Sequence, residues 1–185
     1  MLIRRMTQQE KKNVIYDTVV VGGGIAGVCA AAAAAKNRSK TLLIENSTFL
    51  GGVVTMGPLE ALMTQYDTER KVIGGMADEL LEFIRKQDTQ SGNVDDTTGY
   101  CNKIIPYQSE SVKYAMLCML NKYQVDFLLE TTLVDAYVED QVLVGIEVQT
   151  KRERITVTAK AFVDCSGSGI LGYYSGCDIM FGDET

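Results

Sequence analysis

Three glycines and one glutamate have the spacing of a dinucleotide-binding site. Gly22, Gly24 and Gly27 follow a β-branched strand and open a helix, and Glu45 ends a second apolar strand. Glycine permits a tight turn at the first position, close approach of a pyrophosphate to the backbone at the second, and close helix–strand packing at the third. A carboxylate about 20 residues further on bonds the ribose hydroxyls. The strand-turn-helix context therefore predicts dinucleotide binding.

The neighbours of these residues complete the candidate cofactor site. Ile25 and Ala26 stand between the second and third glycines, where backbone N–H groups at a helix N-terminus bind anions, and Asn46 follows the acid. An acid at the end of the second strand favours the unphosphorylated ribose of NAD or FAD over that of NADP. From these residues alone, both NAD and FAD remain open.

Missing residue types exclude several kinds of chemistry. The chain has no His, which removes His-based general bases, Ser-His-Asp triads and His-containing zinc sites. Its five Cys are widely spaced and form no CxxC pair, so we expect neither a disulfide framework nor a metal site. The same pattern predicts a reducing, cytoplasmic location.

Charge and hydropathy argue against nucleic acid and membrane as partners. The 185 residues carry 18 Lys+Arg against 24 Asp+Glu, a net charge of −6, without the clustered cations that nucleic acid or anionic lipid requires. The uncharged run 18–35 contains glycines and mostly Ala where a membrane span would carry Leu and Ile, so a buried strand-turn-helix explains it better.

Apolar periodicity predicts an α/β fold: a central parallel sheet with helices plus an antiparallel β-meander. We expect an N-terminal arm (1–13) and one FAD/NAD(P)-binding, Rossmann-like domain (14–185), in which 46–124 form a helical connection and 131–160 the meander. Helices are expected at 25–36, 75–86, from Ser109 onward and at 170–175, with a loop at 87–104. Strands are expected at 16–21, 41–45, 125–130, 132–138, 142–149, 153–158 and 161–165.

The spacing of the strands bears on the choice of cofactor. In a nicotinamide-binding half, a third strand should follow the second within a few tens of residues. Here the next strand-like run begins near Val125, after Gly51-Gly52, two helices and loops. This long connection is unlike a nicotinamide-binding half.

Five segments of the chain carry a family resemblance: VVVGGGIAGVCAAAAAA, LLIEN, FLGGVVT, VIGGMADELLEFI and AKAFVDCSGSGILGYYSGCD. Together they resemble the N-terminal part of the bacterial FAD-dependent oxidoreductase family, within the glutathione-reductase-like flavoproteins. The resemblance covers roughly residues 15–182, and the motifs stand in the family's order.

The resemblance implies FAD as the cofactor and assigns residues to it. The three glycines would hold the pyrophosphate and Glu45 the adenosine ribose. Gly51 and Gly52 would approach the flavin side, and Val134 would touch the adenine. Cys165, Ser166 and Gly167 would pass beside the pyrophosphate. The family usually has an acid where this chain has Ser168, and often a second one at Ile170.

The family also continues beyond the point that corresponds to Thr185, and it adds a further strand to the sheet. We therefore expect the strand at 161–165 to be an open edge of an apparently truncated domain. Because unpaired strand edges recruit other chains, self-association through this edge is predicted.

The predicted function is the FAD-binding part of a flavin-dependent oxidoreductase that acts on a small organic substrate. Residues 50–64 contain no cysteine pair, which excludes the disulfide-reductase branch, and no catalytic residue is assigned. The alternative is a nucleotide-binding module, for FAD or NAD, without redox activity of its own.

Overall fold

A six-stranded mixed sheet forms the centre of the molecule in the computed structural model, which describes residues 15–58, 60–67, 69–180 and 182. The expected arm at 1–13 lies outside these residues. The strands stand in the order β8-β2-β1-β11-β10-β9. Their bounds are β1 (Tyr16–Val21), β2 (Thr41–Ile44), β8 (Asp126–Leu128), β9 (Thr132–Glu139), β10 (Val142–Gln149) and β11 (Arg154–Asp164).

The four neighbours β8, β2, β1 and β11 are parallel, whereas β10 and β9 continue the sheet in antiparallel pairing. This arrangement confirms the predicted α/β class, with a parallel sheet and an antiparallel meander. Strands β1 and β2 read as continuous apolar runs because both faces of the sheet are covered. Val20 and Leu43 face one core, and Val19 and Leu42 face the other.

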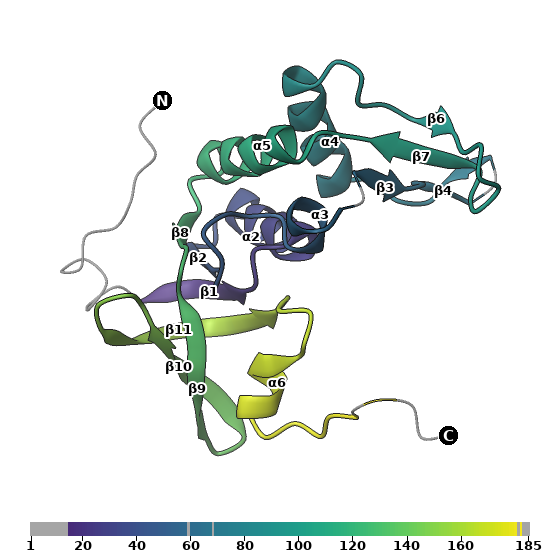
Figure 1. Cartoon of the computed structure of the whole chain (residues 1–185). Helices are drawn as coiled ribbons and strands as arrows, with labels where there is room; N and C mark the ends of the chain where they lie inside the picture. The colour runs from purple at the N-terminus through teal and green to yellow at the C-terminus, as the bar shows by residue number, and fades with distance from the viewer. Residues whose placement is uncertain (1–14, 59, 68, 181, 183–185) are drawn as a thin grey trace.

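Helix α2 (Ile25–Lys36) packs on one face of β1 and β2, and α4 (Met76–Gln87) and α5 (Ser109–Lys122) pack against α2 (Figure 1). Small side chains let α2 lie close to its neighbours, and Ala31 and Ala32 are fully buried. The predicted helices are thus confirmed, although the residue at the N-cap of α5 is Gln108 rather than Ser109. No helix in the described part of the chain is long and apolar enough to cross a membrane.

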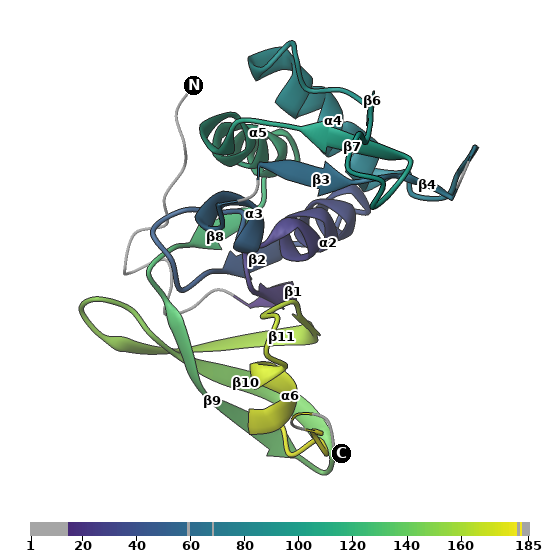
Figure 2. The ribbon, with the colours of Figure 1, turned by 45° about the vertical axis from the view of Figure 1, so that its right-hand side comes forward.

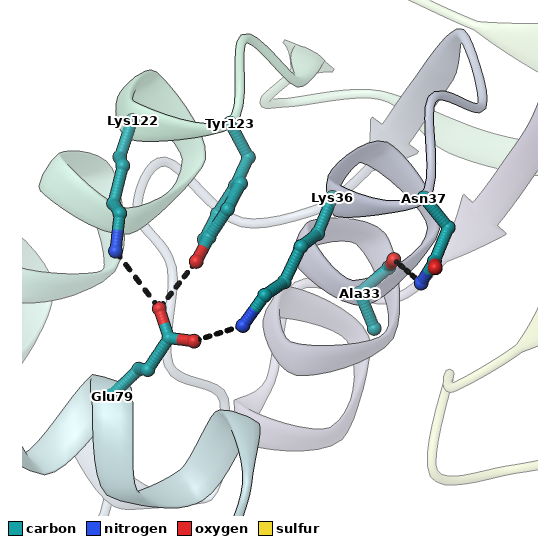
Figure 3. Close-up of polar contacts among 6 residues, drawn as sticks. All are labelled: Ala33, Lys36, Asn37, Glu79, Lys122 and Tyr123. Carbon is teal, nitrogen blue, oxygen red and sulfur yellow. Dashed lines mark hydrogen bonds and ion pairs between the residues drawn. The ribbon is translucent and has the colours of Figure 1, made fainter.

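One carboxylate joins these three helices at their surface (Figure 3). Glu79 of α4 accepts hydrogen bonds from Lys36 at the end of α2, and from Lys122 (2.9 Å) and Tyr123 at the end of α5. The lysine charges sit in the last turns of α2 and α5, where they also complement the helix dipoles.

The meander and the short helix α6 (Ile170–Tyr174) lie on the other side of β1 from α2 (Figure 2). They close a second core around Leu42, Ile44, Ile146 and Leu171. Covering the second face in this way leaves the carboxyl ends of β1 and β2 beside the turn that leads into α6.

Strand β11 corrects the predicted strand pattern, because 153–158 and 161–165 form one continuous strand. Arg154–Thr158 pair with β10, and Ala159–Asp164 pair with β1. The residues between the two predicted strands are Ala159 and Lys160, neither of which breaks a strand. The meander is therefore continuous with the parallel sheet and is not a separate layer.

The connection at 46–124 also differs from the prediction, since it contains strands as well as helices. A three-stranded sheet in the order β3-β7-β6 and a β4-β5 hairpin lie beyond α4, and the expected loop 87–104 supplies β6 and the start of β7. These strands have only two to four residues each and lack clear alternation, so the sequence carries little signal for them. Their bounds are β3 (Ala61–Met63), β4 (Tyr66–Asp67), β5 (Arg70–Lys71), β6 (Val94–Asp95) and β7 (Lys103–Pro106), with α3 at Val53–Met56.

Candidate functional site: a glycine turn beside a small pocket

The three glycines of the turn after β1 have different environments. A Cβ atom at Gly22 would lie 2.3 Å from the carbonyl oxygen of Cys165, and one at Gly27 would lie 1.7 Å from that of Gly22. Gly22 also has a φ of +105°, which L side chains rarely adopt. A Cβ at Gly24, in contrast, meets no protein atom within 4 Å. The first and third glycines are thus required by the fold, and the second faces open space.

Helix α2 begins at this open position. Gly24 is its N-cap, no side chain of the described residues caps it, and its first turn contains no acid. The first intrahelical hydrogen bond runs from Val28 N–H to Gly24 O (3.0 Å), which leaves the N–H groups of Ile25, Ala26 and Gly27 without an intrahelical acceptor. These groups and the helix dipole favour an anion at Gly24.

Gly51 and Gly52 lie directly against the same turn. Gly51 N–H donates to Gly23 O (2.8 Å), and Gly51 forms a parallel bridge with Gly24. A Cβ at Gly52 would lie 3.4 Å from the Gly24 Cα. We expected the three-glycine turn and the pair Gly51-Gly52 to contact one cofactor, and in the structure the two segments lie side by side.

Contacts within the connection at 46–124 hold the segment that carries Gly51 and Gly52. The buried side chain of Tyr107, just before α5, donates its hydroxyl to Val54 O (2.8 Å) in α3. Lys113 of α5 lies over the ring of Phe49, 4.0 Å from its centroid. The insertion thus fixes the segment that carries Gly51 and Gly52.

Glu45 is buried, and its carboxylate is held by protein donors. Gly23 N–H donates to Oε2 (2.6 Å), and Ser47 donates to Oε1 through both its N–H (2.7 Å) and its hydroxyl. Glu45 is 6% exposed. The acid expected at a ribose therefore also fixes the shape of the glycine turn, a role that sequence spacing did not show.

A pocket of about 190 Å³ lies beside Glu45, at the carboxyl ends of β1 and β2. Ligand sites hold roughly 300–1,000 Å³ for a whole drug-sized molecule, so this pocket fits one part of a dinucleotide. Its position agrees with the rule that ligands bind outside the carboxyl ends of parallel strands. The lining residues are Val21, Gly22, Ile44, Glu45, Asn46, Thr131, Thr132, Leu133, Ser166, Ser168 and Ile170.

The structure brings some of the predicted residues into this pocket and leaves others next to it. Gly22, Glu45, Asn46 and Ser166 line it. Thr132 and Leu133 of β9 line the pocket, whereas the predicted Val134 does not. The other predicted residues do not line the pocket and belong to the adjoining turns: Gly24, Ile25, Ala26, Gly27, Gly51, Gly52, Cys165 and Gly167.

Sequence reasoning missed the second half of the lining. Thr131 and Thr132 enter because the Thr131 N–H donates to Glu45 O (3.0 Å), which brings the start of β9 to the end of β2. Ser168 comes from the turn before α6, and Ile170 is the first residue of α6. A signal existed for the threonines, since they follow β8, the parallel neighbour of β2 in the sheet.

The cysteines nearest the turn are not nucleophiles. Burial raises the pKa of the Cys29 thiol to about 11. Burial and the neighbouring Asp164 charge also raise the pKa of Cys165. Both thiols are protonated at neutral pH, and the five cysteines form no disulfide. Among the described residues no cluster of His, Cys, Asp and Glu could hold a metal ion.

The sequence profile of a family described as FAD dependent oxidoreductase matches residues 17–185. The chain belongs to this family. The membership confirms the resemblance seen in the sequence and decides between NAD and FAD in favour of FAD. No curated protein matches the chain in sequence.

Several solved structures share the fold. A flavoprotein/dehydrogenase from Cytophaga hutchinsonii has a TM-score of 0.67 and 17% identity, over 92% of this chain and 44% of its own. A geranylgeranyl bacteriochlorophyll reductase-like protein from Thermoplasma acidophilum has a TM-score of 0.60 and 21% identity, over 89% of this chain and 42% of its own. The L-proline dehydrogenase from P. horikoshii has a TM-score of 0.60 and 14% identity, over 86% of this chain and 55% of its own. The chain thus spans about half the length of these proteins.

Proposed function

We propose that this chain binds FAD through the glycine turn and the pocket, as the cofactor-binding part of an oxidoreductase that acts on a small organic substrate. The observation that carries the proposal is the open space at Gly24, at the uncapped N-terminus of α2. A side chain of almost any other residue would fill that space, whereas the adjoining glycines are explained by the fold alone. The residues present therefore fit a pyrophosphate.

The two ends of the nucleotide would meet different parts of the chain. The N–H groups of Ile25, Ala26 and Gly27 would bind the pyrophosphate, with Cys165 and Gly167 alongside. Glu45 and Asn46 would bind the adenosine ribose. Thr132 and Leu133 would adjoin the adenine, in place of the predicted Val134.

Gly51 and Gly52 would face the flavin half. The neighbouring side chains of Val53 and Met56 are 84% and 58% exposed and apolar, so they offer a surface that excludes water from a bound ring. When bound, the flavin supplies the transfer of a hydride or electrons to or from the substrate. The chain's own part is to bind and orient it, and no side chain is assigned as a catalytic acid or base.

The test is to identify the nucleotide that the protein holds. We expect the purified chain, after incubation with FAD and gel filtration, to retain visible flavin absorption and to release intact FAD on denaturation. NAD incubated in the same way should not be retained. A chain that retains neither nucleotide, or NAD alone, would contradict the proposal.

One observation favours the alternative of a nucleotide-binding module without redox activity. Among the described residues that line the pocket, Glu45 is the one with a titratable side chain, and its carboxylate is held by protein donors. The comparison of FAD with ADP separates the two functions. Tighter binding of FAD shows that the flavin half is engaged, whereas equal affinities would favour the alternative.

We also propose that the protein works in the cytoplasm. All five cysteines are free, including the exposed Cys177, which suits a reducing compartment. Fractionation of the source cells with an antibody against the chain tests this, and recovery from a secreted fraction would contradict it.

A further inference from the structure

The turn between β11 and α6 forms part of the wall of the pocket. Ser166 and Ser168 of this turn, and Ile170 at the start of α6, line it together with Glu45 and Asn46. Asp164, the last residue of β11, precedes the turn and is not itself among the lining residues. Its position raises the question of what holds the turn in place.

The Asp164 carboxylate accepts four hydrogen bonds from the turn. Oδ1 accepts from the N–H (2.9 Å) and the hydroxyl (2.6 Å) of Ser166. Oδ2 accepts from the N–H groups of Leu171 (2.9 Å) and Gly172 (3.1 Å), in the first turn of α6. The Ser166 hydroxyl in turn accepts from Ile170 N–H (3.2 Å). One carboxylate thus ties both ends of the turn together.

The composition of the turn makes it costly to order. Gly167 and Gly169 have positive φ angles of 78° and 69°, and glycine loses more conformational entropy on ordering than any other residue. Gly169 is the N-cap of α6 and has no side chain with which to cap it, and α6 has only five residues. Asp164 supplies that cap from six residues upstream of the helix.

The charge of Asp164 is maintained in this environment. Burial opposes ionisation, but the hydrogen bonds from Ser166, Gly172 and Leu171 outweigh it and hold the pKa of Asp164 below its ordinary value of 3.8. Hydrogen bonds to a charged acceptor are stronger than those to a neutral one. The Asp164 side chain is therefore ionised at neutral pH and can accept all four hydrogen bonds.

We infer that Asp164 is a positioning residue that holds the Ser166–Ile170 wall in the shape that receives the nucleotide. The inference rests on the proposed function, because it assigns Asp164 a part in binding FAD without contact between the two. Asp164 acts through the residues that it anchors and is not a catalytic residue.

The test compares Asp164→Asn with the control Asp17→Asn. Asparagine keeps the size of Asp164 but replaces one acceptor oxygen with an amide NH₂, which cannot accept from Leu171 and Gly172. Asp17, at the opposite end of the parallel sheet, accepts from Lys160 and from Lys40 N–H, outside the pocket. FAD affinity, amide hydrogen exchange and stability to urea are measured for both variants and the wild type.

We expect Asp164→Asn to weaken FAD binding by about tenfold or more, the equivalent of losing one hydrogen bond to a charged group. Amide exchange should become faster at 166–172, with a stability to urea close to that of Asp17→Asn. A merely structural role would lower stability and leave the affinity of the folded protein unchanged. FAD affinity equal to that of the control would overturn the inference.

Two further outcomes are also decisive. If the wild type binds no FAD, the proposed function fails, and amide hydrogen exchange then decides whether Asp164 positions the turn. Faster exchange at 166–172 in Asp164→Asn, but not in Asp17→Asn, supports the positioning role. Unchanged exchange in Asp164→Asn overturns it. If Asp164→Asn does not fold, Asp164→Glu, which keeps both acceptor oxygens, takes its place. Wild-type affinity and exchange in that variant would then show that the placement of the carboxylate does not matter, and would overturn the inference.

Discussion

At the scale of single residues, the glycine pattern divides into two positions that the fold requires and one that faces open space. Gly22 and Gly27 leave no room for a side chain, because each lies against a backbone carbonyl. A Cβ at Gly24, in contrast, would meet no atom of the described residues within 4 Å. The same three-glycine pattern thus contains two different constraints, and substitutions at these positions should separate folding from binding.

Glu45 serves both purposes, and its replacement should show both. We predict that Glu45→Ala weakens FAD binding by about 1–3 kcal/mol, the scale of hydrogen bonds to a charged group. It should also lower the free energy of unfolding, because the N–H groups of Gly23 and Ser47 lose their acceptor. Isothermal titration with FAD and urea unfolding measure the two effects.

Glu60→Ala is the matched control for Glu45→Ala. The Glu60 carboxylate also accepts a backbone N–H, that of Ser109 (2.9 Å), but it lies outside the pocket. It should leave FAD affinity unchanged. If Glu45→Ala and Glu60→Ala bind FAD as tightly as the wild type, Glu45 has no part in the site.

The sequence predicted residues whose roles depend on local spacing. Gly22, Glu45 and Asn46 were found because a strand, a turn, a helix and a second strand are consecutive in the chain. Thr131, Ser168 and Ile170 were not found, because they reach the pocket through pairing between segments far apart in sequence. Asp164 was missed for another reason: its role depends on backbone donors, which residue types do not reveal.

At the scale of elements, helix packing was more predictable than strand continuity. The apolar faces of these two helices fixed both ends of α4 and the start of α5 to within about a residue, because a period of 3.6 persists over several turns. Strand β11 was divided in two because it changes partners, from β10 to β1, while its backbone continues. A change of the neighbouring strand does not alter the two-residue alternation of side chains along β11, so the sequence pattern does not reveal it.

The Glu79 cluster makes a prediction about pH at this scale. Hydrogen bonds from Lys36, Tyr123 and Lys122 lower the pKa of Glu79 from its ordinary value of 4.5 to about 2. The stabilisation that it gives is fully present above pH 4.5 and is lost as the pH falls toward 2. The lysines are half exposed, so solvent screening limits the contribution at neutral pH to about 1 kcal/mol or less.

Urea unfolding of the wild type and Glu79→Gln between neutral pH and pH 2 tests this. Glu79→Gln should be less stable at neutral pH, and the difference should shrink to zero near pH 2, since other carboxylates titrate alike in both proteins. Glu110→Gln, which removes an exposed i,i+3 pair with Lys113, is the control and should show little difference at any pH. A constant difference between wild type and Glu79→Gln would contradict the prediction.

At the scale of the whole molecule, one segment in the middle of the sheet is paired on one side only. The residues expected to form an edge strand, 161–165, belong mostly to the longer strand β11, which stands between β1 and β10 in the sheet and whose first half pairs with β10. Beyond Thr158, however, no strand of the described residues pairs with the side of β11 that faces away from β1. Val163 is 36% exposed there. An open strand segment of this kind can pair with another chain.

We propose that this 185-residue chain self-associates through 159–164. Light scattering should show a concentration-dependent dimer or larger species, and Val163→Lys should shift it toward monomer because a charge at a strand edge blocks pairing. Val142→Lys, on the exposed end of the β9–β10 hairpin, should leave the association unchanged. A wild type that stays monomeric at high concentration would contradict the proposal.

The proposed function requires that FAD enters the open space at Gly24. A titration of glycine variants with FAD tests this most directly. Gly24→Val fills that space in an extended backbone (φ −68°, ψ −177°) that valine tolerates, and Gly92→Val is its control, since a Cβ at Gly92 also meets no atom within 4 Å. We predict that the wild type and Gly92→Val bind FAD with equal affinity, whereas Gly24→Val remains folded and binds none. Unchanged FAD binding in folded Gly24→Val would contradict the account.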